Sequence, residues 1–154
     1  MTDRITKERR SALMASVRTK DTAPELVVRR AIFSRGFRFR LHRRDLPGVP
    51  DIVLPGKRVA IFVNGCFWHQ HRGCVIAKAP SSNAAFWQEK FRKNRQRDHL
   101  ATLALREEGW RVLTIWECAT RNSDSLAQLG NQFAKWIKSR KLTGEFSALP
   151  SRKL

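Results

Sequence analysis

The sequence predicts an α/β fold with a central mixed sheet. Three observations support this prediction: two helical segments come first, three short apolar stretches joined by turn residues follow, and a long helix, a strand and a last helix complete the chain. Elements in this order pack as helices on both sides of a sheet. A length of 154 residues fits one domain, so we expect residues 1–154 to form a single unit.

The two N-terminal helices are predicted from apolar spacing and capping signals. Residues 4–18 can form a helix with three apolar anchors among basic residues. Thr22-Ala23-Pro24-Glu25 has the pattern of a capping box, with proline in the first turn. A helix over about 23–35, closed by Gly36, should follow.

Three strands are predicted next. Residues 37–41 alternate apolar and basic side chains, which indicates a half-buried strand. The apolar stretches 51–54 and 58–63 flank Pro55-Gly56-Lys57, a short link that favours an antiparallel hairpin. Asp51 would then stand at the start of the hairpin's first strand.

The second half of the chain predicts a helix, a strand and a helix. Cap residues at 81–83 precede a long helix to about residue 108, which Gly109 ends. Residues 110–116 read as a buried strand, and a last helix begins at Ser123 or Asp124. We expect residues 142–154 to form a loosely held tail, because their apolar periodicity is weak.

The charge indicates a polyanionic partner. Lys and Arg number 31 against 13 Asp and Glu, a net charge of +18. Basic side chains gain affinity for DNA by releasing counterions from its phosphates, although a basic surface can also serve solubility alone. No apolar run is long enough to cross a bilayer, no signal peptide is visible and the three cysteines are odd in number, so we expect a soluble cytoplasmic protein with no membrane partner.

One cluster of cysteines and histidines predicts a metal site. Cys66, His71 and Cys74 have the spacing C-x4-H-x2-C, and the remaining cysteine, Cys118, follows a predicted strand. Three thiolates and one imidazole can close a tetrahedral zinc site, which would be structural because no position is left for water. The alternatives are three buried free thiols, or His69 in place of His71 as the ligand.

Asp51 is a candidate ligand for a second, catalytic cation. The hairpin would bring the end of the next strand, at Val63, beside its carboxylate. A hard cation such as Mg²⁺ would take the carboxylate, a backbone carbonyl and phosphate oxygens. Spacing alone also fits a turn or cap role for an aspartate after proline.

A set of motifs in fixed order resembles the bacterial very-short-patch mismatch repair endonuclease family. The resemblance covers residues 9 to about 120. Its motifs are Arg10-Ser11 with Met14, Thr22-Ala23-Pro24-Glu25, Gly48-Val49-Pro50-Asp51, Ile61-Phe62-Val63-Asn64-Gly65-Cys66-Phe67-Trp68-His69, Phe86-Trp87 with Glu89-Lys90, Lys93-Asn94, Arg97-Asp98, Gly109-Trp110-Arg111-Val112-Leu113 and Trp116-Glu117-Cys118.

The resemblance implies a restriction-endonuclease-like, three-layer fold and a zinc- and Mg²⁺-containing bacterial endonuclease acting on the nucleoid. Such an enzyme hydrolyses the phosphodiester 5′ of a thymine mispaired with guanine, and downstream repair proteins follow it. The oligomeric state stays open, but a monomer is sufficient for a lesion without two-fold symmetry. By the same transfer, Cys66, His71, Cys74 and Cys118 bind zinc, Asp51 and the Val63 carbonyl bind magnesium, and His69, supported by Asp98, acts as general acid or base, with Glu25 as a further active-site residue.

Some of these residues have competing roles. Glu25 belongs to the capping box, and Asp98 can pair with Arg95 or Arg97 on its own helix. Relatives that carry threonine or histidine at positions 63 and 64 have side chains that Val63 and Asn64 do not supply. The Glu-x-Lys motif usual in restriction-like nucleases is absent after Asp51, so the site depends on the histidine variant or is inactive.

Aromatic side chains beside the zinc loop predict a DNA wedge. Phe67 and Trp68 follow a proposed zinc ligand, and the resemblance implies that they enter the base stack while Met14 approaches from the opposite side. We therefore expect residues 1–20 to act as a DNA-contacting helix or arm. Inserting apolar groups costs stacking energy, and costs less at a mispair. Ordinary core packing is the alternative, and Trp87 is either another DNA contact or part of the helix packing.

Two other functions remain open from the sequence. One is a related nickase or restriction-type nuclease with another target, and the other is a zinc-containing DNA-binding module without cleavage. Mg²⁺-dependent nicking of mismatched but not of paired DNA separates the three.

Overall fold

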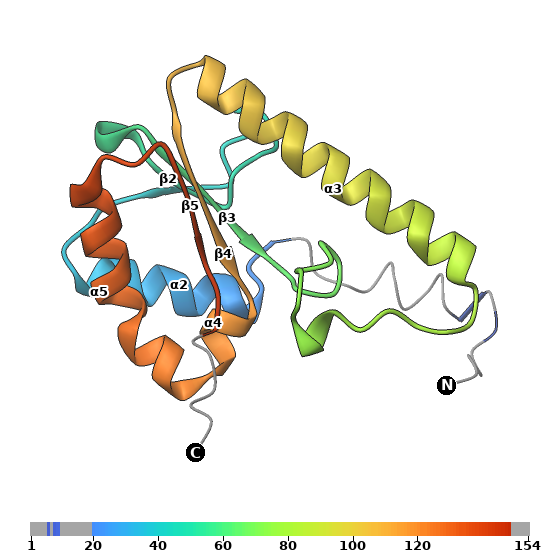
Figure 1. Ribbon diagram of the computed structural model, residues 1–154. Coiled ribbons are helices and arrows are strands. Elements are labelled where there is room, and N and C mark those ends of the chain that lie inside the picture. Colours follow the sequence, from blue (N-terminus) through green and yellow to red (C-terminus); the bar gives the residue numbers. More distant parts are fainter. Residues whose placement is uncertain (1–5, 7, 10–19, 149–154) are drawn as a thin grey trace.

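A five-stranded mixed sheet forms the centre of the protein (Figure 1). The computed structural model describes residues 6, 8–9 and 20–148, so most of the predicted helix 4–18, including Met14, lies outside the described residues. The strands lie in the sheet in chain order. They are β1 (Arg40–Leu41), β2 (Ile52–Leu54), β3 (Val59–Asn64), β4 (Arg111–Trp116) and β5 (Thr143–Phe146).

The predicted hairpin and the mixed character of the sheet are confirmed. β1, β2 and β3 pair antiparallel, and Ile52 lies opposite Ile61. β3, β4 and β5 pair parallel, and Val63 lies opposite Ile115. The link Pro55–Lys57 is one turn of 3-10 helix, η1. Asp51 therefore comes immediately before β2, and Val63 lies near the end of β3.

Helices cover both faces of the sheet, as the three-layer prediction requires (Figure 1). On one face α2 (Ala23–Ser34), α4 (Cys118–Arg121) and α5 (Ser123–Ser139) pack against the sheet through a single apolar cluster. On the other face, Leu105 of α3 (Ala84–Glu107) packs on Val53, Ala60 and Val112. The buried strands alternate between the two clusters residue by residue, because neighbouring side chains of a strand point to opposite faces.

The long helix α3 extends beyond the sheet. Its C-terminal end packs on the core, and its N-terminal half runs beside the loop that follows β3 (Figure 1). Gly109, with φ +86°, ends the helical segment as predicted. The loop contains a second 3-10 turn, η2 (Val75–Ala77). Of the described helices, none is long and apolar enough to cross a membrane.

Two sequence predictions need correction. The strand expected over 37–41 is reduced to Arg40–Leu41, and Phe37 and Phe39 pack against the core from outside the ladder. The expected loose tail is wrong for residues 143–146, which form the edge strand β5. Its side chains alternate only between exposed and half-buried, so the strand depends on backbone pairing and on contacts such as Trp136 Nε1–H to the Thr143 carbonyl (3.3 Å).

Candidate active site and metal centre

A cleft of about 850 Å³ opens where the hairpin meets α2, α3 and the loop after β3. Its lining includes residues from each of these segments. Among them are Glu25, His42, Asp51, Val63, His69 and Asp98. The structure thus brings all four predicted catalytic side chains, and the predicted carbonyl ligand, to one place.

Asp51 is a largely buried carboxyl in this cleft. Its Oδ2 accepts a hydrogen bond from the Val63 backbone N–H (2.8 Å). Burial raises the pKa of Asp51 to about 7; the Val63 N–H opposes this rise, the charge of Glu25 adds to it, and His42 and His69 oppose it. An ionised carboxylate at this place is costly without a positive partner, so the position suits a cation.

The Val63 carbonyl fits the same cation. The N–H and C=O of one strand residue point to the same side of the strand, and the Val63 N–H points to Asp51. Continuing the β2–β3 register by two residues places Pro50 opposite Val63. Because proline has no N–H to donate, Pro50 cannot take up this carbonyl in the ladder. A carboxylate and a backbone carbonyl on one side are the oxygen ligands that Mg²⁺ prefers.

His69 and Asp98 form a dyad across the cleft. His69 Nδ1 lies 2.5 Å from Asp98 Oδ2, so the imidazole donates to the carboxylate and turns Nε2 away from it. In the described part of the chain, the ion pair of Asp98 is with His69 and not with Arg95 or Arg97. One turn earlier on α3, Asn94 Nδ2 donates to the Trp68 carbonyl (2.9 Å). The helix therefore holds both the imidazole and the peptide before it.

Glu25 takes part in the cap of α2 and also lines the cleft. Its backbone N–H donates to Thr22 Oγ1 (3.4 Å), and its Oε2 accepts from the backbone N–H of Asp21 (2.9 Å), one residue before the position expected for a capping box. The same buried carboxylate lines the cleft and lies 3.2 Å from Arg29 Nη2.

Sequence reasoning missed His42, Arg29 and Asp21, which surround Glu25. Arg29 Nη2 lies 2.6 Å from Asp21 Oδ1 and 3.1 Å from His42 Nε2. A lone histidine after a weak strand gives no signal by itself. The pairing of Leu41 with Ile52 would have placed His42 beside Asp51, but that register was not available from the sequence.

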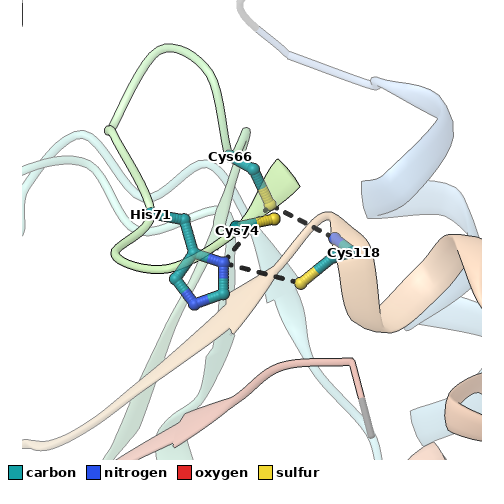
Figure 2. Close-up of side chains that lie close together, drawn as sticks. All are labelled: Cys66, His71, Cys74 and Cys118. Atoms are coloured by element: carbon teal, nitrogen blue, oxygen red, sulfur yellow. Dashed lines mark hydrogen bonds between the residues drawn. The ribbon is translucent and has the colours of Figure 1, made fainter. Parts of the chain in front are cut away.

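Cys66, His71, Cys74 and Cys118 converge on one point, as Figure 2 shows. Their ligand atoms all lie within 4.8 Å of one another, so the cluster could hold a metal ion. His71 Nδ1 lies 3.6 Å from Cys66 Sγ and 3.5 Å from Cys118 Sγ. The structure thus brings His71 to the thiols and His69 to Asp98. It therefore distinguishes the candidate metal ligand, His71, from His69, which the sequence spacing alone could not do.

The surroundings of the thiols favour a bound cation. Burial raises the pKa of Cys66, so a thiolate there needs a positive partner. Backbone N–H groups of Cys118 and Ala148 donate to Cys66 Sγ (3.4 Å) and Cys118 Sγ (3.3 Å). The His71 ring stacks on Trp116 with centroids 4.2 Å apart, which fixes its orientation. Sulfur ligands held by N–H donors and an oriented imidazole are typical of a structural metal centre.

The aromatic residues next to this centre form one cluster. The Phe67 ring lies 5.1 Å from Trp68, 5.5 Å from Trp87 and 5.2 Å from Phe91, between ring centroids. Trp87 is buried, which agrees with helix packing, one of the two interpretations left open for it. Trp68 and Phe67 are half-buried, and Trp68 also lines the cleft.

Basic side chains also line the cleft. Lys20, Arg44, Lys90 and Arg97 are among its lining residues. A cleft lined by both carboxylates and cationic side chains suits a polyanion together with a metal ion.

Comparison with known proteins agrees with this arrangement. A model of the family described as DNA mismatch endonuclease Vsr matches residues 2–75. The type II nicking enzyme V.XorIIP of Xanthomonas oryzae pv. oryzae is 51% identical, over 85% of this chain and 96% of its own length. The DNA mismatch endonuclease Vsr of Escherichia coli K12 is 40% identical, over 89% of this chain and 88% of its own. The type II nicking enzyme V.NmeAIP of Neisseria meningitidis is 38% identical, over 90% and 98% respectively.

Proposed function

Since the chain belongs to the DNA mismatch endonuclease Vsr family, we propose that it is an endonuclease that nicks one strand of double-stranded DNA 5′ of a thymine mispaired with guanine. Such a nick would start the repair of a deaminated 5-methylcytosine. The observation that carries the proposal is the cleft that Asp51, bonded to the Val63 backbone, shares with the His69–Asp98 dyad. The cleft lies beside the β2–β3 hairpin of the restriction-endonuclease-like, three-layer fold.

We assign two different cations to the two clusters. Asp51 and the Val63 carbonyl would hold Mg²⁺, because both ligands are oxygens. Cys66, His71, Cys74 and Cys118 would hold Zn²⁺, because three thiolates and an imidazole complete its tetrahedral shell. Magnesium would supply a Lewis acid for the phosphate and for an attacking water, whereas zinc would fix the loop.

The chain's own contribution to hydrolysis is proton handling and orientation. His69 would move a proton through Nε2, the nitrogen that Asp98 leaves available. Asp98 would hold the ring in that orientation. Glu25, which is buried beside Asp51, would add negative charge to the cation site and would not transfer a proton.

We propose that the duplex binds along the basic residues and that Phe67 and Trp68 act as a wedge. Trp68 lines the cleft, and packing in the aromatic cluster with Trp87 and Phe91 would hold the two rings in place. Met14 would approach from the opposite side, with residues 1–20 as the arm, and Trp87 would contact DNA only if the cluster opened. A monomer is sufficient, because a T/G lesion has no two-fold symmetry. We place the enzyme in the cytoplasm, on the nucleoid, before downstream repair proteins.

The test uses labelled duplexes that differ in one base. The full chain is incubated with a T/G duplex and with the fully paired duplex, with and without Mg²⁺; chelators are left out so that the Cys/His site keeps its ion. Nicking of only the mismatched duplex, dependent on Mg²⁺, is expected. Binding without a cut would instead favour a DNA-binding module.

A second candidate function is supported by the names of two relatives. V.XorIIP and V.NmeAIP are described as type II nicking enzymes, a name without a stated mismatch. A nickase with another target would cut the paired duplex at a defined sequence. Sequencing the products of a randomised mismatch library distinguishes this outcome from T/G-directed nicking.

Removing the Asp98 carboxylate should slow catalysis without weakening DNA binding. In the Asp98→Ala variant His69 loses the acceptor at Nδ1, and the single-turnover nicking rate should fall by about 10²-fold, within the range of general acid–base catalysis. The affinity for the T/G duplex, measured by fluorescence anisotropy without Mg²⁺, should stay within about threefold. Glu107→Ala, which changes an exposed side chain in the last turn of the same helix, is the control and should nick at the wild-type rate. An unchanged rate for Asp98→Ala would contradict the dyad.

Removing the Trp68 ring should weaken the discrimination between T/G and T/A duplexes without slowing the hydrolysis step. Trp68→Ala should lower the ratio of T/G to T/A binding affinity by about tenfold, because base–aromatic stacking contributes about 1–3 kcal/mol per base. Phe33→Ala removes an exposed ring from α2 and serves as the control. Competition binding with the two duplexes measures the ratio, and a ratio equal to that of the wild type would exclude Trp68 as a wedge.

A further inference from the structure

His42 lies in the cleft in a backbone conformation that needs an explanation. Its φ is +47°, in the left-handed region that side chains with a β-carbon rarely adopt. Its backbone N–H donates to the Asp51 carbonyl (3.2 Å), which extends the β1–β2 pairing by one residue. The strained conformation thus places a second imidazole directly beside Asp51, and strained residues of this kind are concentrated at functional sites.

The contact with Arg29 favours the form of His42 that carries hydrogen on Nδ1. Arg29 Nη2 is the nearest of the polar atoms beside His42 Nε2, at 3.1 Å, followed by Asp21 Oδ1 at 3.3 Å and Glu25 Oε2 at 3.6 Å. A guanidinium can only donate, so a neutral ring that bonds to Arg29 accepts at Nε2 and carries its hydrogen on Nδ1. A protonated ring, which donates from Nε2 to a carboxylate, also carries hydrogen on Nδ1. Nδ1 is a donor in both of these states.

The Nδ1–H of His42 is directed to the side of Asp51 but does not bond to it. Nδ1 lies 4.0 Å from Asp51 Oδ1, beyond hydrogen-bond distance, and the side chain is one-fifth exposed and lines the cleft. The other carboxylate oxygen, Oδ2, is the one that takes the Val63 N–H. The donor is thus available to a group bound next to Asp51.

We propose that His42 is a further substrate-contacting residue, whose Nδ1–H donates a hydrogen bond to a phosphate oxygen of DNA bound beside Asp51. The inference rests on the proposed nicking function and adds a second imidazole to it. His69 handles the proton, whereas His42 transfers none and stabilises negative charge on the phosphate. A fixed donor at an oxyanion is effective because it needs no reorganisation during the reaction.

A second metal ion among the same residues is the competing use of this place. Ligand atoms of Asp21, Glu25 and His42 lie within 4.8 Å of one another. Arg29 Nη2, however, already lies 2.6 Å from Asp21, 3.2 Å from Glu25 and 3.1 Å from His42. The guanidinium occupies the centre of this group and supplies its positive charge, which favours a hydrogen-bonding role for His42.

The first experiment compares His42→Ala with His42→Asn. Asparagine tolerates a positive φ, and its amide nitrogen reproduces the position of Nδ1. On the T/G duplex, His42→Ala should lower the single-turnover rate at saturating enzyme by about 10- to 100-fold, with the duplex Kd within about threefold and a folded near-UV circular dichroism spectrum. His42→Asn should recover most of the rate. Equal rates for the two variants, or a loss that follows Kd or stability, would overturn the proposal.

The second experiment needs no activity. Long-range ¹H–¹⁵N spectra of the histidine rings, with His42→Asn identifying the signal, should show the Nδ1–H form in the neutral ring. In Arg29→Met, Asp21 becomes the partner of Nε2, and the hydrogen should move to Nε2. An Nε2–H form in the wild type would overturn the proposal. Wild-type nicking of the T/G duplex tests the proposed function separately, so the two failures are distinguishable.

Discussion

Replacing Asp51 with asparagine should abolish nicking and at the same time stabilise the protein. The substitution removes the cation-binding carboxylate, which is worth several kcal/mol of transition-state stabilisation, so the rate should fall by at least about 10³-fold. Asparagine keeps an oxygen that can accept from the Val63 N–H. The local fold should therefore remain.

The expected gain in stability follows from the sign of the pKa shift. Burial raises the pKa of Asp51 to about 7 from 3.8, so the folded state binds this proton more tightly than the unfolded state. The free energy of unfolding is therefore reduced as pH rises from about 4 to about 7, and stays reduced above. In magnesium-free buffer at pH 8, the Tm of D51N should exceed that of the wild type by a few degrees.

The matched control is Asp45→Asn, which removes an exposed carboxylate of the same region. Asp45 pairs with Arg43 at the surface, so this variant should keep its nicking rate. Scanning calorimetry and single-turnover nicking measure the two effects in one set of variants. A D51N protein that nicks normally would refute the cation site, and one that is inactive because it is unfolded would refute the claim that this carboxylate is a burden to the fold.

Loss of one ligand from the Cys/His cluster should both release the metal ion and unfold the loop between β3 and α3. Structural zinc supplies about 10–16 kcal/mol in small metal-dependent domains. Cys118→Ala should therefore lower the zinc content to a small fraction of one equivalent and the Tm by more than about 10 °C. Nicking should fall in parallel, because the same loop carries His69.

A pair of histidine variants checks that this effect belongs to the cluster. His71→Ala should reproduce the loss of zinc, whereas His99→Ala, on the exposed side of α3, should keep it. Zinc is measured by plasma emission spectrometry after dialysis, and Tm by circular dichroism. A fully loaded Cys118→Ala protein with an unchanged Tm would exclude Cys118 as a ligand.

The parts of the fold that could be predicted are those with strong local signals. The hairpin was readable because apolar stretches flank Pro55-Gly56-Lys57, and α3 because its pattern ends at Gly109. β5 was missed because Thr143–Phe146 has little apolar character and pairs through its backbone. Non-local pairing of a polar edge strand leaves almost no trace in sequence.

The same distinction applies to the candidate site. The metal cluster was readable because its ligand types are rare and two of its cysteines are close in sequence. Asp51 was already a candidate from its place in the predicted hairpin, whereas His69, Glu25 and Asp98 were selected by resemblance. The structure brings all four into one cleft. His42 and Arg29 could not be found, because their relation to Asp51 depends on strand register and on a helix packed beside it.

The spacing of Asn94 and Asp98 on α3 has a mechanical consequence. The two side chains are four residues apart, and they grip adjacent residues of the loop, the Trp68 carbonyl and the His69 ring. Under the proposed function, a duplex that displaces Trp68 from its position would therefore also displace the His69 imidazole from the phosphate. Mismatch recognition and strand cleavage would then be coupled through α3.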